Sequence, residues 1–185
     1  MVIVTPESLI GGPPMSVTDE LLANAERYAA TFDKGALPLP PAKHVAVVAC
    51  MDARLNPYGI LGLSEGDAHV IRNAGGLARD ALRSLVISQQ LLGTREIVVI
   101  HHTECGMLTF TNEQLHVKVR HELGADASAI DFQPFPDLEQ SVVDDVRFLR
   151  ESPLLIEGVP VRGFVYDVHN GRLTEVNVPS AAAVG

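Results

Sequence analysis

The sequence predicts an α/β fold: a mostly parallel central sheet with flanking helices, an antiparallel edge hairpin at the C-terminus and an N-terminal helical arm. Three apolar, β-branched runs predict buried strands at residues 44–50, 68–71 and 96–100. Residues 80–92, between the second and third runs, carry apolar side chains at helical spacing. Strands that alternate with helices favour a parallel sheet covered by helices, in which ligands bind beyond the carboxyl ends of the strands.

Residues 16–33 are predicted to form the N-terminal arm. Ser16-Val-Thr-Asp19 resembles a capping box, and apolar residues follow at helical spacing. The apolar stripe packs either on the chain's own core, which the sequence alone favours, or on a partner subunit. Residues 1–15 show no periodicity and are expected to be a loose lead-in. With 185 residues, the whole chain (1–185) is expected to be a single domain.

The C-terminal half is predicted to contribute two more helices and the edge hairpin. Residues 112–123 and 138–151 read as helices, the latter from the spacing of its apolar side chains. Residues 161–168 and 173–178 read as strands that flank Asn170-Gly171, a pair typical of a two-residue type I′ turn. The sheet is therefore expected to end in an antiparallel pair.

Composition excludes several classes of function. A net charge of −9, a pI near 5.1 and the lack of a basic stripe argue against nucleic acid as a partner. No apolar stretch approaches the roughly 18 to 20 residues that span a bilayer, and the N-terminus lacks the pattern of a signal peptide. We therefore expect a cytoplasmic protein without a membrane partner. In a reducing compartment, the two cysteines are expected to be thiols or metal ligands, and not a disulfide.

Residues with metal-binding chemistry follow two of the predicted strands. Cys50, Asp52 and Arg54 come at the end of the first run, spaced so that they share one face of an extended chain. His102 and Cys105 follow the third run and would converge if the strand turned into a helix. If the two strands are neighbours, two thiolates and one imidazole meet, and this set suits tetrahedral Zn²⁺.

The fourth zinc position decides between a structural and a catalytic site. Asp52 could occupy it and close the site, or pair with Arg54 and leave a position for water. Taken separately, each motif also fits a purely structural role, in which a cysteine after an apolar strand is only a small buried side chain. The two motifs together favour a metal site.

The chain resembles the β-class carbonic anhydrases, in particular the short bacterial and archaeal branch that includes mycobacterial members. The resemblance rests on Cys50-x-Asp52-x-Arg54 and His102-x-x-Cys105, on the segment from Ile71 to Gly76 and on Cys105-Gly106-Met107, and it covers residues 16–178. It implies a zinc lyase that reversibly hydrates CO₂ to bicarbonate by hydroxide formed on one Zn²⁺ per subunit, with activity that rises into mild alkali.

The resemblance also implies a role for each residue of the motifs. Cys50, His102 and Cys105 would bind Zn²⁺, and Asp52 would join them only in a closed form. Asp52 and Arg54 would be the catalytic dyad, and the backbone N–H of Gly106 would hold the zinc-bound oxygen or bicarbonate. The other histidines match no catalytic position, and we expect surface or packing roles for them: His44, His69, His101, His116, His121 and His169.

The resemblance further implies an assembly in which sites lie at a dimer interface and the first helix embraces the neighbouring subunit. A homodimer is therefore expected, and a tetramer is possible. Two other functions stay open from the sequence. One is hydrolysis of carbonyl sulfide or carbon disulfide at the same zinc site, and the other is a non-catalytic binding module with a closed structural zinc site.

Overall fold

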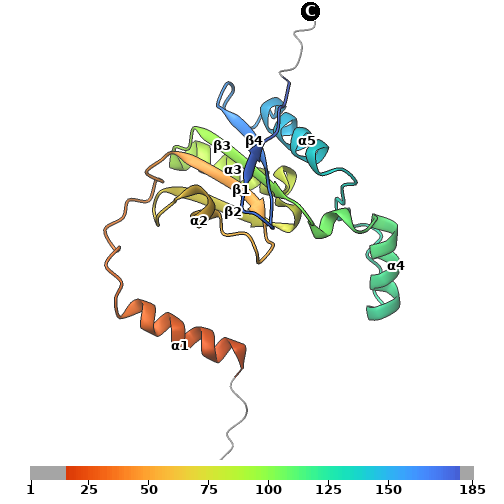
Figure 1. Ribbon diagram of the computed structural model, residues 1–185, viewed down its shortest axis with the longest axis horizontal. Helices are drawn as coiled ribbons and strands as arrows, with labels where there is room; N and C mark the ends of the chain where they lie inside the picture. The colour runs from red at the N-terminus through yellow and green to blue at the C-terminus, as the bar shows by residue number, and fades with distance from the viewer. Residues whose placement is uncertain (1–15, 180–185) are drawn as a thin grey trace, which may run out of the picture. The chain divides into compact units, whose positions relative to one another are not determined.

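The computed structural model describes residues 16–179 (Figure 1). The chain divides into two compact units at the boundary between Leu37 and Pro38. The first unit contains helix α1 (Val17–Ala29), and the second contains all the other helices and strands. The lead-in expected at residues 1–15 lies outside the described residues, and the single domain stays a prediction. Within residues 16–179, no helix is both long and apolar enough to span a bilayer.

Helix α1 begins as the sequence predicts and ends earlier. The Ser16 hydroxyl accepts a hydrogen bond from the Asp19 N–H, and the Asp19 carboxylate accepts one from the Ser16 N–H, which completes the capping box. The helix ends at Ala29, four residues before the predicted end. The Thr31 N–H and hydroxyl both bond to the Tyr28 carbonyl, so a tighter turn replaces the next helical turn.

The second unit is built on a five-stranded sheet in the order β2-β1-β3-β4-β5. The first four strands in this order are parallel, and β4 pairs with β5 in antiparallel fashion, so the predicted fold class is confirmed. The strands are β1 (Val45–Cys50), β2 (Ala68–Asn73), β3 (Glu96–His102), β4 (Val161–Tyr166) and β5 (Leu173–Glu175).

The strand order places the two sequence motifs side by side. Strands β1 and β3 are parallel neighbours, with Ala49 beside Ile100 in the register. The chain leaves β1 to form β2 on one side and crosses to β3 on the other side, so the carboxyl ends of β1 and β3 flank a topological switch point. The adjacency of the two strands, one of the two conditions for the predicted metal site, is therefore met.

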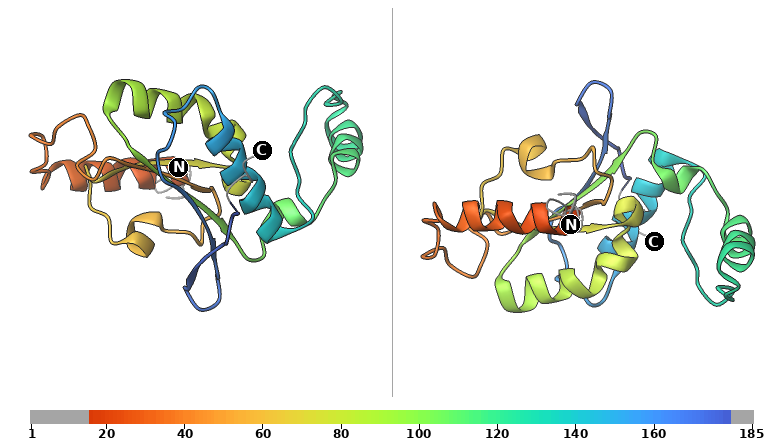
Figure 2. Two further views of the ribbon diagram at one scale, coloured as in Figure 1. Left: turned by 90° about the horizontal axis from the view of Figure 1, so that it is seen from above. Right: turned by 90° about the horizontal axis from the view of Figure 1, so that it is seen from below.

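Helices cover both faces of the sheet (Figure 2). Helices α3 (Ala78–Leu92) and α5 (Leu138–Glu151) pack on the face that carries Ala46 and Val48 of β1. On the other face, the short helix α2 (Pro57–Leu61) contributes to a cluster around Val47, Ala49 and Ile100. Strand β1 is buried on both faces, as its continuous apolar run predicts.

Helix α4 (Asn112–Leu123) differs from α3 and α5 because none of its residues is buried. It lies away from the sheet in the views of Figures 1 and 2. Its bounds match the prediction, since Thr111 and Gln114 form a second capping box at its start and Gly124 ends it in the left-handed conformation.

Gly76 lies against the backbone of β1 and β3, the two strands that carry the motifs. It lies in a short 3₁₀ turn (Ala74–Gly76) with φ of +74°, which favours glycine. A Cβ atom there would lie 2.7 Å from the Cys50 backbone nitrogen and 3.0 Å from the Ile100 carbonyl oxygen. The turn can therefore touch both β1 and β3 only because residue 76 has no side chain.

The predicted type I′ turn at Asn170-Gly171 is wrong. The β4–β5 pairing ends at Tyr166 opposite Leu173, and a longer loop joins the strands. The Asp167 carboxylate accepts hydrogen bonds from the His169 N–H and the Asn170 side-chain amide, which holds the loop in a wider turn. Among the described residues with positive φ, Gly171 is included and Asn170 is not, although a type I′ turn needs both.

Candidate metal centre

The structure brings together Cys50, His102 and Cys105, the three residues that the sequence predicts to be zinc ligands. All three side chains are buried, and their ligand atoms lie within 4.8 Å of one another. The two Sγ atoms are 4.0 Å apart. Within residues 16–179, no other group of three or more His, Cys, Asp or Glu side chains has its ligand atoms this close together.

Cys105 reaches the cluster through a turn and not through the helix that the sequence suggested. The Thr103 N–H still bonds to the Tyr166 carbonyl and so extends the β3–β4 pairing by one residue. Glu104 then adopts a left-handed conformation, with φ of +54°, in the turn that follows the strand. A 3₁₀ turn (Gly106–Leu108) begins only after Cys105.

The geometry fits tetrahedral zinc. Two Zn–S bonds of about 2.3 Å at tetrahedral angles place their sulfurs about 3.8 Å apart, which is close to the observed separation. The His102 Nδ1–H donates to the Thr103 carbonyl oxygen at 2.9 Å, so the lone pair lies on Nε2. Nε2 is buried and has no hydrogen-bond partner within residues 16–179. A buried imidazole nitrogen left without a partner is what a missing metal ion would explain.

The protonation of the two sulfurs also suits a cation. A hydrogen bond from Cys105 lowers the pKa of the Cys50 thiol well below its usual range, against the opposing effect of burial. The same contact and burial raise the pKa of Cys105. Burial alone would lower the pKa of His102, but the negative charge of the neighbouring Cys50 opposes this, and the pKa is raised. The cluster thus carries negative charge on sulfur beside groups that would lose protons to a metal.

Asp52 lies at the edge of the cluster and is held by Arg54. Its Oδ1 accepts hydrogen bonds from the Arg54 backbone N–H at 2.8 Å and from Nε at 3.0 Å, and its Oδ2 accepts one from Nη2 at 2.8 Å. The guanidinium keeps the pKa of Asp52 well below its usual range, so the carboxylate is ionised. Oδ2 is 3.8 Å from His102 Nε2. Of the two arrangements left open by the sequence, the structure has the Asp52–Arg54 pair.

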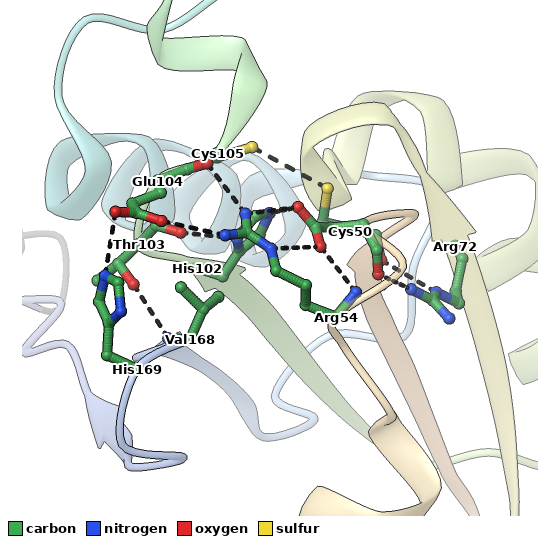
Figure 3. A network of polar contacts seen from close by, with 10 residues as sticks. Cys50, Arg54, Arg72, His102, Thr103, Glu104, Cys105, Val168 and His169 are labelled. Atoms are coloured by element: carbon green, nitrogen blue, oxygen red, sulfur yellow. Dashed lines mark hydrogen bonds and ion pairs between the residues drawn. The ribbon is translucent and has the colours of Figure 1, made fainter.

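Arg72 supports the loop that carries these residues, and the sequence analysis gave it no role. Its Nε donates to the Cys50 carbonyl at 3.0 Å and its Nη2 to the Asp52 carbonyl at 2.6 Å (Figure 3). The only signal in the sequence was its place in the segment that resembles the family. The two hydrogen bonds tie β2 to the chain that leaves β1.

Two further charged side chains surround Arg54 and were also missed. Glu104 Oε2 accepts a hydrogen bond from Arg54 Nη1, and His169 contacts Glu104 (Figure 3). Glu104 stands inside the His-Thr-Glu-Cys motif, but nothing in its spacing indicated a contact with Arg54. His169 comes from the β4–β5 loop, so no local pattern could have connected it to the site.

His101 points to the other side of β3, as the sequence predicts. Its Nδ1 bonds to the Ser141 hydroxyl at 2.7 Å and its Nε2 to Asp145 Oδ2 at 3.1 Å, while its ring stacks on Phe135. Asp145 Oδ2 also accepts from the Ala78 N–H at the start of α3. His101 therefore joins β3, α3 and α5, and it is fully buried without facing the cysteine cluster.

Comparison with known proteins assigns the family. A family model described as carbonic anhydrase matches residues 45–173. The chain is 50% identical over 163 residues to β-carbonic anhydrase 1 of Mycobacterium tuberculosis, covering 88% of this chain and 99% of that protein. The chain belongs to the β-carbonic anhydrase family. The reaction of this family is the reversible hydration of CO₂.

Two other similarities bear on fold and substrate. The solved structure of a carbonic anhydrase from Streptococcus mutans is 48% identical, with a TM-score of 0.84 over 88% of this chain and 99% of that one. A carbon disulfide hydrolase from Acidithiobacillus thiooxidans is 31% identical over 180 residues, which cover 86% of this chain and 90% of that protein. The family relationship thus includes relatives with two different named substrates.

Proposed function

We propose that this β-carbonic anhydrase is a zinc enzyme that hydrates CO₂ to bicarbonate through the Cys50–His102–Cys105 cluster. The observation that carries the proposal is a buried cluster of three ligand side chains from which Asp52 is held back by Arg54. Three protein ligands with a fourth position for solvent are typical of catalytic zinc, whereas structural zinc has four protein ligands. The Asp52–Arg54 pair therefore favours an enzyme over a structural zinc module.

Cys50, His102 and Cys105 would hold the ion. Zn²⁺ there would supply Lewis acidity that brings the pKa of a water molecule towards neutrality. Both cysteines must stay reduced to bind zinc. We therefore propose a reducing compartment, the cytoplasm, as the sequence suggested. One Zn²⁺ per chain accounts for the three ligands.

Asp52 would act on the attacking water as a hydrogen-bond acceptor. Its carboxylate is ionised, and its fixed position next to His102 Nε2 would orient the lone pair of the water towards CO₂. Arg54 would keep this carboxylate from becoming a metal ligand, and Asp52 would bind the metal only if the pair with Arg54 opened. The backbone N–H of Gly106, next to Cys105, would donate to an oxygen of the substrate or product.

We also propose that the enzyme is at least a homodimer, and a tetramer would extend the same assembly. Helix α1 carries exposed apolar side chains and has no buried residue. Helix α4 likewise has none buried and exposes Val117 and Leu123. Apolar side chains exposed on a helix are typical of protein interfaces. The partner that we propose is a second copy of the chain.

Stopped-flow CO₂ hydration on protein of measured zinc content tests the function, at about pH 8.5 so that the metal-bound solvent is ionised. We expect turnover proportional to zinc content, loss of turnover on chelation and recovery when zinc is returned. Parallel assays with carbonyl sulfide and carbon disulfide test the alternative that the 31% identical hydrolase raises. A preference for either sulfur substrate over CO₂ would overturn the proposed substrate.

A further inference from the structure

The guanidinium of Arg54 is held on two sides. Its Nε and Nη2 donate to Asp52, while its Nη1 donates to Glu104 Oε2 at 3.0 Å. Nη2 also donates to the backbone carbonyl of Glu104 at 3.2 Å. The two carboxylates use different edges of the guanidinium, so both can be bound together and Glu104 does not displace Asp52.

The backbone of Glu104 is set for this contact. Its φ of +54° lies in the left-handed region, which a residue with a Cβ rarely adopts. In this conformation both its side chain and its carbonyl face Arg54 (Figure 3). Cys105 is the next residue in the chain. The position of its sulfur and the contact of Glu104 with Arg54 therefore both depend on the left-handed conformation of Glu104.

Glu104 is in turn held by His169. The His169 Nε2–H donates to Glu104 Oε1 at 3.0 Å, so the two oxygens of Glu104 face different partners. The β4–β5 loop that carries His169 is fixed at two points. The Val168 N–H bonds to the Thr103 hydroxyl, and the His169 N–H bonds to Asp167. The contact joins residues 65 positions apart.

This network is not explained by fold stability. The side chains of Arg54, Glu104 and His169 are 46%, 56% and 69% exposed. Ion pairs with this exposure stabilise a fold by less than about 1 kcal/mol each, because water screens the charges. The network instead contacts Arg54 on one edge of its guanidinium, and the other edge binds Asp52.

We propose that Glu104 and His169 are positioning residues, which hold the Arg54 guanidinium in the orientation that binds Asp52 and so keeps this carboxylate off the metal. The inference rests on the proposed function. Without the contact to Glu104, the guanidinium gains rotational freedom and the Asp52–Arg54 pair is weakened. Asp52 then competes for the metal, so the enzyme should turn over more slowly while holding zinc as tightly as before or more tightly.

Two variants and two controls test the proposal in the zinc-loaded full chain. Glu104→Gln removes the charge, and His169→Ala removes the donor to Glu104. Glu175→Gln is the matched control, since Glu175 pairs with Arg162 on the β4–β5 hairpin at similar exposure and without contact to Arg54. His169→Gln keeps an N–H donor and should rescue the loss caused by His169→Ala.

We expect kcat to fall about tenfold in Glu104→Gln, because the loss of a hydrogen-bond partner behind a metal site typically lowers activity by at least that factor. The fall should be smaller in His169→Ala, because His169 contacts Arg54 only through Glu104. KM and the melting temperature should stay unchanged. Zinc affinity, measured by competition with a chelator, should stay the same or rise. In ¹⁵N NMR spectra, the Arg54 Nε–H should exchange with water faster than in the unmodified protein, whereas Glu175→Gln should change none of these quantities.

Several outcomes would overturn the inference. Unchanged kcat and unchanged Arg54 Nε–H exchange would show that Glu104 does not position Arg54. A fall in zinc affinity parallel to kcat would show a general structural role. In the Asp52→Asn background, Glu104→Gln should cause no further loss, and a full additional loss would contradict action through Asp52. If the unmodified zinc-loaded protein fails to hydrate CO₂, the proposed function fails, and the NMR exchange still tests the contact.

Discussion

The inner and outer halves of this site differ in how they are held in place. The inner half, Cys50, His102 and Cys105, is buried, and its side chains come from the ends of two adjacent strands and the turn that follows one of them. The outer half, Arg54, Glu104 and His169, is exposed and is held by hydrogen bonds between charged side chains. Packing thus brings the three possible metal ligands together, and we infer that the exposed contacts act by orienting the neighbouring carboxylate of Asp52 through Arg54.

This difference predicts different consequences for the same kind of substitution. Changes in the inner half should remove the metal or the fold around it. Changes in the outer half should leave metal and fold in place and alter the rate.

The largest effect is expected from His102→Gln, with His101→Gln as its matched control. His102→Gln removes the nitrogen that has no other partner, so zinc affinity should fall at least a hundredfold or so and activity with it. His101→Gln breaks buried contacts with Ser141 and Asp145, so it should lower the unfolding free energy by about 3 kcal/mol and still bind one zinc. Metal analysis and denaturant unfolding measure both. Equal zinc loss in the two variants would contradict the assignment.

A large loss of stability is expected from Gly76→Ala. The new methyl group would meet the backbone of β1 and β3 in a conformation that favours glycine, at a cost of about 3 kcal/mol or more. The control is Gly62→Ala, whose φ of +63° is similar but whose surroundings are open within 4 Å. Thermal unfolding should show a clearly larger drop in Tm for Gly76→Ala. Equal drops would mean that backbone strain alone matters.

A loss of rate without loss of metal is expected from Asp52→Asn. The amide oxygen is an uncharged and weaker acceptor than the carboxylate, so kcat should fall about a hundredfold. Zinc content and melting temperature should stay within error, because the three buried ligands remain. Stopped-flow kinetics and metal analysis on the same sample check this. Loss of zinc or of stability would instead favour a closed structural site.

The smallest effect concerns protons released when zinc binds. In the sulfur pair the pKa of Cys50 is lowered and that of Cys105 is raised, so Cys105 holds a proton that it must lose to bind zinc. Zinc binding should therefore release at least one proton per chain at about pH 7. Since His102 must be neutral to bind and its pKa is raised, the affinity should fall as the pH drops through that pKa. Calorimetry in buffers of different ionisation enthalpy gives the number, and release of no proton would contradict the shared proton of the two sulfurs.

The inner half could be predicted from the sequence because it depends on local patterns. The apolar runs gave β1 and β3, and the ligands follow them at short spacing. Only one long-range condition, the adjacency of β1 and β3, had to hold, and parallel α/β sheets favour it. The bounds of α4 were also predictable, because Thr111 and Gly124 mark its ends.

The outer half could not be predicted because its contacts depend on side-chain hydrogen bonds in loops. Asp167 widens the β4–β5 loop, so the expected two-residue turn at Asn170-Gly171 was wrong, and only the wider loop presents His169 to Glu104. The end of α1 was misjudged for a related reason, since the Thr31 side chain binds the backbone. Exposed polar contacts of this kind leave no periodicity in the sequence.

X-ray absorption at the zinc edge of the loaded full chain tests the central claim most directly, namely that Cys50, His102 and Cys105 share one ion with a further ligand. We expect one zinc per chain, with two sulfur ligands at about 2.3 Å and two nitrogen or oxygen ligands at about 2.0 Å. The sulfur contribution should fall to one in Cys105→Ser. A site with no sulfur ligand, or with a sulfur contribution that Cys105→Ser leaves unchanged, would contradict the account.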